Sequence, residues 1–184
     1  MADLKVVTGE VRLSYANLLT PRSPQEGAPP KYSVVLLIPK TDKKTIAAIR
    51  AAQTQALEDG KAKFGGKVPA KWTDTLHDGD TEADLERNPE YAGMWYISTS
   101  ANEQYPPNVV DRSLNKILDP SEIYSGMWAR VSMVAFAFNT QGNKGVSFGL
   151  RNVQKTRDDE PFGGTSRAED DFEALPEDED ESLI

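Results

Sequence analysis

The clearest pattern of apolar and polar positions lies at residues 124–153, YSGMWARVSMVAFAFNTQGNKGVSFGLRNV. An alternating run over residues 127–138 is followed by a polar turn containing Gly142, Asn143 and Gly145, and a second run ends at Val153. Two alternating runs around a glycine-bearing turn are typical of a β-hairpin. The sequence therefore predicts one long hairpin here.

The two faces of this hairpin differ in chemistry, because side chains alternate across a strand. The first face is small and apolar: Met127, Ala129, Val131, Met133, Ala135 and Ala137. The second mixes aromatic, charged and polar groups: Trp128, Arg130, Ser132, Val134, Phe136 and Phe138. In the returning strand, Val146, Phe148 and Leu150 alternate with Ser147, Gly149 and Arg151. The first face suits a barrel interior and the second a flat, negatively charged ligand, which Gly149 would let come close.

Three more strands are predicted from the remaining pattern. Residues 4–15 alternate, with Gly9 as a bend, and residues 31–38 are apolar on both faces, as a central strand is. Residues 93–101 form the next predicted strand, whereas the proline-rich residues 17–30 predict a loop.

One helix is predicted after the second strand. Thr41 or Asp42 can cap it, and Ile46, Ile49, Gln53 and Leu57 follow at helical spacing. Gly60 is expected to supply a left-handed residue beyond its end. The apolar stripe is narrow, so we expect the helix to lie over the strands. Residues 61–92 are expected to form a long excursion, and residues 121–125 a short helical turn.

Five predicted strands with glycine-marked bends favour a mostly β fold with added helices. We expect a five-stranded OB-type Greek-key barrel with the long helix after the second strand. A twisted α+β sheet is the competing architecture.

The charge of the chain is segregated. Residues 1–157 hold 20 Lys and Arg against 17 Asp and Glu, a net charge of +3, and residues 158–184 hold one Arg against 12 acids, a net charge of −11. The sequence thus predicts an OB-fold domain over residues 1–157 and a disordered acidic tail over residues 158–184.

Composition excludes several classes of protein. The chain has no cysteine, hence no disulfide or thiolate metal site. It has no apolar run of membrane-spanning length and no signal-peptide core at its start, so we expect a soluble, cytoplasmic protein.

Aromatic and cationic residues are the candidate ligands of a nucleic-acid strand, since rings stack on bases and cations contact phosphates. The candidates of the hairpin are Trp128, Arg130, Phe136, Phe138, Lys144 and Arg151. Those elsewhere are Tyr32, Lys40, Lys67, Lys71, Trp72, Tyr91 and Trp95. The alternative interpretation is that the rings belong to the core and the lysines are ordinary solvated residues.

Catalysis is not indicated, and no cofactor is expected. The chain has no phosphate-cradling glycine loop, nucleophile elbow or zinc motif. Asp74, Asp78, Asp80 and Glu82 are the acidic residues a metal-dependent nuclease would use, but their spacing fits no calcium loop, and His77 is the lone histidine.

The acidic tail has two interpretations: a solubilising charge run, or a flexible polyanion that competes with nucleic acid for the basic groove and binds partner proteins. Its apolar positions, which a partner would contact, are Phe172, Leu183 and Ile184.

Several short motifs together resemble a known family. They include Arg12 with Ser14, Ile38-Pro39-Lys40 with Asp42, Asp78-Gly79-Asp80, Tyr91 with Gly93 and Trp95, Pro107 with Val109 and Asp111, Tyr124-Ser125-Gly126, Gly142-Asn143-Lys144-Gly145 and Val153-Gln154. With the acidic tail, they resemble the bacteriophage-encoded OB-fold single-stranded DNA-binding proteins. Related tails often end on phenylalanine, whereas this one ends Ser182-Leu183-Ile184.

The resemblance implies coating of single strands in phage DNA replication, recombination and repair, without enzymatic activity and with recruitment of replication proteins through the tail. We therefore expect a sequence-nonspecific single-stranded DNA-binding protein. For its oligomeric state, a homodimer is one of the alternatives left open. The alternative is a structural or adaptor phage protein that binds other proteins through the same surface.

Overall fold

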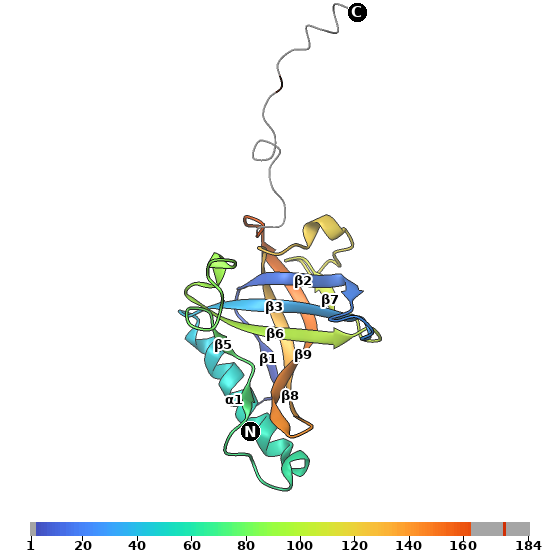
Figure 1. Cartoon of the computed structure of the whole chain (residues 1–184). Helices are drawn as coiled ribbons and strands as arrows, with labels where there is room; N and C mark the ends of the chain where they lie inside the picture. The colour runs from blue at the N-terminus through green and yellow to red at the C-terminus, as the bar shows by residue number, and fades with distance from the viewer. Residues whose placement is uncertain (1–2, 163–174, 176–184) are drawn as a thin grey trace, which may run out of the picture.

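The computed structural model describes residues 3–162 and residue 175, and over these it is mostly β with one α-helix (Figure 1). The five long strands are β2 (Val11–Arg22), β3 (Lys31–Pro39), β6 (Met94–Asn102), β8 (Trp128–Thr140) and β9 (Asn143–Arg157). The short strands are β1 (Lys5–Val7), β4 (Thr73–Asp74), β5 (His77–Asp78) and β7 (Asn108–Val110). The helices are α1 (Lys43–Asp59) and the 3-10 turns η1 (Lys61–Phe64), η2 (Pro89–Tyr91) and η3 (Pro120–Glu122). No helix in this described part is long and apolar enough to cross a membrane.

The five long strands pair in a closed circuit. β3 pairs antiparallel with β2 on one side and β6 on the other, so the prediction of a central strand is confirmed. β6 meets β9 in parallel at Ser100 and Gly149, and β9 pairs antiparallel with β8 along the hairpin. β8 returns to β2 at Val11 and Ala129. Figure 1 shows β2, β3 and β6 side by side, crossing in front of β8 and β9.

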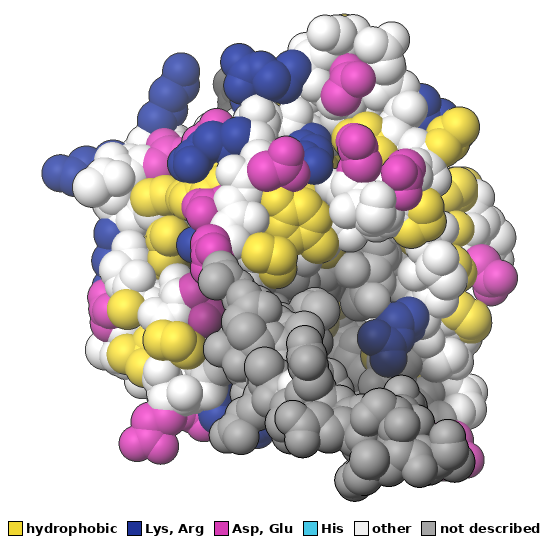
Figure 2. All heavy atoms as spheres, turned by 90° about the horizontal axis from the view of Figure 1, so that it is seen from above, with side chains coloured by type: hydrophobic (Ala, Val, Ile, Leu, Met, Phe, Trp, Pro, Cys, Tyr) yellow, Lys and Arg dark blue, Asp and Glu magenta, His cyan; other side chains and the backbone are white. Residues whose placement is uncertain are grey.

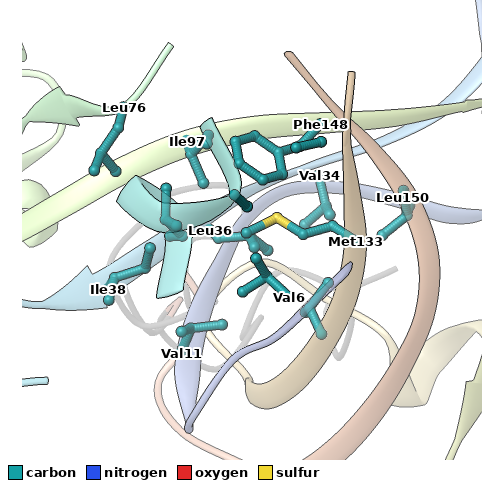
Figure 3. Packing of buried hydrophobic residues seen from close by; sticks show 14 of the residues in the cluster. Val6, Val11, Val34, Leu36, Ile38, Leu76, Ile97, Met133, Phe148 and Leu150 are labelled. Carbon is teal, nitrogen blue, oxygen red and sulfur yellow. The ribbon is translucent and has the colours of Figure 1, made fainter. Parts of the chain in front are cut away.

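Apolar side chains from all five long strands fill the interior of this circuit. Figure 3 shows Val34, Leu36 and Ile38 of β3 near Ile97 of β6 and Met133 of β8. The hairpin face predicted to be interior is buried along its whole length: Met127, Ala129, Val131, Met133, Ala135 and Ala137. This prediction is confirmed.

Helix α1 lies over the strands, as predicted, and packs against β8, β1 and β9. The Asp42 carboxylate accepts a hydrogen bond from the Thr45 backbone N–H and caps the helix. The prediction for Gly60 is wrong, because its φ is −93°, outside the left-handed region. Glycine is needed there for space: a Cβ would lie 2.6 Å from Ala137 Cβ. The left-handed glycine is Gly65, which ends η1 with φ 75°.

The predicted loop over residues 17–30 is wrong in its first part. β2 continues to Arg22, through two irregularities in its pairing with β3, one between Ser14 and Asn17 and one between Asn17 and Arg22. Pro21 lies within the second, where the strand does not need a backbone donor. The bend at Gly9 is confirmed, since it separates β1 from β2.

The hairpin turn is tighter than predicted. Thr140 pairs with Asn143, so the turn consists of Gln141 and Gly142, both with positive φ, while Gly145 already belongs to β9. Farther along the hairpin, a bulge leaves Arg151 between the pairs Ser132–Asn152 and Met133–Leu150. Ser132, predicted to face outward, is buried, and its Oγ accepts a hydrogen bond from the Asn152 N–H at 3.1 Å.

The excursion over residues 61–92 contains little regular structure, as predicted, and the two-residue strands β4 and β5 attach it to β9 and β6. Strand β7, which pairs in parallel with β9, was not predicted. Its three residues are too short for an alternating pattern.

Candidate nucleic-acid interface

Small side chains cover the outer surface of the circuit from β8 across β9, β6 and β3 to β2. Because alternate residues face inward, the register places the others together outside: Phe136 pairs with Ser147, Gly149 with Ser100, and Ser98 and Ser14 with Val35. We call this surface the outer strip; it comprises Ser33, Val35, Ser98, Ser100, Phe136, Ser147 and Gly149. At the β2 end, Ser14 has the same orientation but is buried, with its hydroxyl bonded to Tyr91. The five strands from β8 to β2, spaced by about 4.8 Å, span roughly 19 Å.

Phe136 is the exposed ring of the strip. Its side chain lies in the middle of a strand and yet is 47% exposed, while the neighbouring core positions are buried. Gly149 lies beside it, and a Cβ there would meet only the Val134 carbonyl oxygen at 3.9 Å and Phe136 Cε1 at 4.0 Å. The ring and the glycine thus form an open surface on which a flat group can lie.

Two exposed or half-exposed cations of the hairpin have no side-chain partner among the described residues. Arg151 projects from the bulge, and Lys144 lies just beyond the turn. Lys144 lines a shallow hollow of about 660 Å³ with Lys71 and Trp72, residues that lie some seventy positions away in the sequence. Lys67 is exposed in the same excursion. Phe138 covers Gly145, where a Cβ would lie 2.7 Å from its ring.

Trp128 and Arg130 are already engaged by other residues. The Trp128 indole N–H donates to Asp159 Oδ2 at 2.8 Å, and the Arg157 guanidinium carbon lies 4.4 Å from the ring centroid. Arg130 is exposed, and its Nε–H donates to the Thr8 carbonyl oxygen at 3.2 Å.

Residues 158–162, which we call the clasp, hold Trp128 in this state. Arg12 donates to the Glu160 carbonyl oxygen at 2.8 Å and lies 4.4 Å from the Phe162 ring centroid. The Asp158 carboxylate accepts from the Tyr124 hydroxyl at 2.8 Å and lies 2.7 Å from Lys155 Nζ. The hydrogen bonds from Lys155 and Tyr124 lower the pKa of Asp158, and the Trp128 N–H lowers that of Asp159. The clasp therefore binds as an ionised segment.

The face seen from above in Figure 2 combines Lys and Arg side chains (dark blue) with Asp and Glu (magenta) around an apolar patch (yellow). The carboxylates of the clasp likewise pair with cations of the body, Asp159 with Arg12 and Asp158 with Lys155. The cations around Trp128 are therefore already neutralised by acidic residues of the same chain.

Tyr91 and Trp95 lie in packed surroundings. Tyr91 is buried, its hydroxyl donates to Ser14 Oγ at 3.1 Å, and burial raises its pKa. Its ring meets that of Tyr96 edge to face at 5.1 Å. Trp95 is half-buried on the core side of β6, with Lys40 Nζ 5.4 Å from its ring centroid.

Lys40 and Tyr32 are likewise engaged away from the strip. Lys40 Nζ lies 2.6 Å from both Asp78 Oδ1 and Asp80 Oδ2. Tyr32 is on the core side of β3 and lines a hollow beneath the loop that contains Pro106 and Ile117.

The acidic residues of the excursion serve as ion-pair partners. Arg50 Nη1 lies 2.5 Å from Asp74 Oδ2; burial raises the pKa of Asp74, but the hydrogen bonds from Arg50, the Leu76 N–H and Gln53 outweigh it, and the net shift is downward. In the described part of the chain, no group of three or more His, Cys, Asp or Glu is placed to hold a metal ion. This arrangement gives no support to a nuclease site.

Two aromatic residues of this region were not among the predicted site residues. Tyr15 is 60% exposed, and Tyr96 lies on the outer face of β6 with its ring 5.0 Å from that of His77. Tyr15 is the last residue of the predicted strand and lies where the pairing of β2 with β3 is irregular, so the alternation of that strand did not indicate its exposure. For Tyr96, the alternation along β6 was the available signal, because it places Tyr96 on the face opposite the buried Ile97.

Several phage proteins are similar to this chain. The chain shares 28% identity over 188 residues with "Putative protein p50" of Acyrthosiphon pisum secondary endosymbiont phage 1, covering 98% of this chain and 99% of that one. A solved structure of the single-stranded DNA-binding protein from bacteriophage Enc34 in complex with ssDNA has 30% identity and a TM-score of 0.66, covering 87% of this chain and 90% of that one.

The fold also matches gp2.5, a single-stranded DNA-binding protein encoded by bacteriophage T7, with a TM-score of 0.64 at 16% identity, covering 92% of this chain and 94% of that one. At this identity, the match concerns the fold alone. The family model described as "Enterobacter phage Enc34, ssDNA-binding protein" matches residues 4–183. The resemblance found in the sequence is therefore confirmed, and the chain belongs to the family of the Enterobacter phage Enc34 single-stranded DNA-binding protein.

Proposed function

We propose that this protein binds single-stranded DNA, without sequence preference, along the outer strip. The observation that carries the proposal is the exposed Phe136 ring beside the open Gly149, at one end of a surface of small side chains. The ring stacks on a base, and stacking tolerates any base because each has a π-face. Small serine and valine side chains leave room for the strand, and Arg151 and Lys144 contact its phosphates.

We also infer that the closed circuit of β2, β3, β6, β9 and β8 is an OB-type barrel. The strand pairings support this, because the last strand of the hairpin closes onto β6 in parallel while the other pairs are antiparallel. The barrel corresponds to residues 1–157. The barrel is proposed to bind DNA without catalysing a reaction. The protein is proposed to act in the cytoplasm of the phage host.

The acidic tail, residues 158–184, is proposed to compete with DNA for the cations of the body. Phe172, Leu183 and Ile184, which lie outside the described residues, would contact replication or recombination proteins. The clasp supports the competition, since Asp158 already engages Lys155, and Asp159 engages Arg12 and Trp128. Coating of DNA in replication, recombination and repair, and homodimer formation, are further parts of the proposal.

The test is fluorescence anisotropy of a labelled oligo-dT titrated with the full chain at several salt concentrations, with duplex DNA as competitor. Phe136→Ala should weaken binding roughly 5- to 150-fold, the loss of one stacked base at about 1–3 kcal/mol. Arg151→Ala should reduce the slope of log affinity against log salt by about 0.7, the value of one phosphate contact on a single strand.

The matched controls are Leu118→Ala, which removes an apolar side chain that is 74% exposed in a loop, and Lys44→Ala, which removes an exposed cation of α1. Neither should alter the affinity by more than about twofold. Binding that Phe136→Ala and Arg151→Ala leave intact would remove the strip from the site. No binding of any single strand by the folded protein would favour the adaptor function instead.

A further inference from the structure

We propose that the hollow between Tyr15 and Phe162 is a second base-binding site, at the far end of the outer strip from Phe136. The inference rests on the proposed function and extends it: it assigns a nucleobase to a pocket outside the hairpin and gives the path of the strand across β8, β9, β6, β3 and β2.

The hollow has the size and lining that a nucleobase requires. Its volume is about 420 Å³, and Tyr15 and Phe162 supply aromatic surface at its walls. Ser14, Asn88 and Ser125 add hydroxyl and amide groups to the lining. Apolar rings with a few polar groups are typical of sites that bind flat heteroaromatic ligands.

Tyr15 is held open toward solvent by an unusual backbone conformation. Its φ is 48°, in the left-handed region that tyrosine seldom adopts, and its side chain is 60% exposed. The conformation is fixed by neighbouring hydrogen bonds: the Ala16 N–H donates to Ser125 Oγ at 3.2 Å, and the Tyr15 hydroxyl donates to Asn88 Oδ1 at 3.2 Å. Such strain persists where the surrounding structure enforces it, often in a ligand site.

The hollow continues the outer strip. Ser14 lines the hollow and also pairs with Val35 of the strip, and Tyr15 follows it directly in the chain. Phe136 and Tyr15 therefore lie on the first and the last of five neighbouring strands, which span roughly 19 Å. A strand that stacks on Phe136 and runs across β9, β6 and β3 arrives at Tyr15.

The charges at the hollow favour a nucleotide whose phosphate points toward Arg87. Arg87 lines the hollow and is exposed, and its guanidinium has no partner among the described residues. Glu90, which also lines the hollow, disfavours a phosphate on its own side. On the Phe162 side, Arg12 covers the ring at 4.4 Å.

The experiment is photo-cross-linking of the full chain to oligo-dT that carries a single 5-iodouracil at successive positions, followed by trypsin digestion and mass spectrometry. Tyr15 is the sole aromatic residue of the tryptic peptide 13–22, and Phe136 lies in the peptide 131–144. Cross-links to both peptides are expected from different iodouracil positions. Tyr15→Asn, which removes the ring but tolerates the left-handed conformation, should abolish the first cross-link and weaken binding roughly 5- to 100-fold.

Tyr15→Phe, which keeps the ring and loses the hydroxyl, should retain the cross-link to peptide 13–22. The inference is overturned if oligo-dT binds and cross-links to peptide 131–144 alone, while Tyr15→Asn binds as tightly as the unaltered protein; the proposed function would then stand. Absence of binding by any variant would overturn the proposed function as well.

Discussion

At the scale of single residues, Tyr15 combines an exposed aromatic ring with a strained backbone conformation. Tyr15 has φ 48°, and its side chain is 60% exposed, so hydrogen bonds to Ser125 and Asn88 hold the conformation, with little packing of the ring. A left-handed non-glycine residue of this kind costs on the order of 1–3 kcal/mol. The conformation is therefore better explained by a function of the ring than by stability.

Tyr15→Asn is expected to leave the free energy of unfolding unchanged, or to raise it by up to about 1 kcal/mol, because asparagine tolerates the left-handed region. Urea denaturation followed by circular dichroism measures the change. A loss of more than about 1 kcal/mol would mean that the ring stabilises the fold, which would weaken the functional explanation of its conformation.

At the scale of elements, an ion-pair cluster fixes the segment that carries Tyr91 and Asn88. Lys40 at the end of β3 binds Asp78 and Asp80, each at 2.6 Å, and Asp80 Oδ1 also accepts from the Gly93 N–H at 2.9 Å. The hydrogen bonds from Lys40 lower the pKa of both carboxyls and raise the pKa of Lys40. The predicted DNA contact of Lys40 therefore competes with a structural one.

Lys40→Met should loosen this segment, because Asp78 and Asp80 would then face each other without a cation. Trypsin should cleave after the exposed Arg87 several times faster in Lys40→Met than in the unaltered protein. The control is Lys61→Met, which breaks the ion pair of Lys61 with Glu58 at the end of α1. Equal cleavage rates in all three proteins would contradict the role of the cluster.

The cluster also predicts a pH dependence. Since the folded-state pKa of Asp78 and Asp80 lies below the ordinary 3.8, the unfolded chain takes up protons first as pH falls. The stabilisation is thus complete above about pH 5 and is lost as pH falls through the lowered pKa values. The difference in unfolding free energy between the unaltered protein and Lys40→Met should be constant near neutrality and shrink below pH 4.

At the scale of the whole molecule, the start of the acidic tail closes over the end of the sheet where β2 pairs with β8. Gly126 makes this possible: a Cβ there would lie 2.4 Å from the Glu160 carbonyl oxygen, and its φ is 117°. Asp159 of the clasp accepts a hydrogen bond from the Trp128 indole N–H and the Glu160 carbonyl accepts one from Arg12, so two groups suited to DNA binding are already engaged.

Deleting residues 163–184 should tighten single-strand binding, most strongly at low salt, because it removes most of the acidic tail and leaves the clasp with Phe162 in place. Oligo-dT anisotropy of the truncated and full chains at several salt concentrations measures the change. Weaker binding after the truncation would contradict the competition.

The prediction of the site was partly limited by local irregularities. The alternation placed Phe136 outside and Met133 inside correctly, because the pattern around them is regular. It failed for Ser132, which keeps the outward phase between the core residues Val131 and Met133 but is itself buried, for Arg151, which the bulge leaves unpaired in β9, and for Tyr15, where β2 is irregular. A bulge depends on the partner strand, so the sequence of one strand does not reveal it.

By itself, the sequence determined the mostly β fold, the long hairpin, a helix capped at Thr41 or Asp42 and the family, because these depend on alternation, local capping and short motifs. Only the tertiary structure decided which aromatic and cationic groups remain available. Tyr91 became buried against Ser14, Lys40 was paired by Asp78 and Asp80, and Tyr15 stayed exposed. The physical reason is that exposure and ion pairing depend on neighbours distant in the chain, which are brought together by the closure of β8 onto β2 and the return of the excursion to β6.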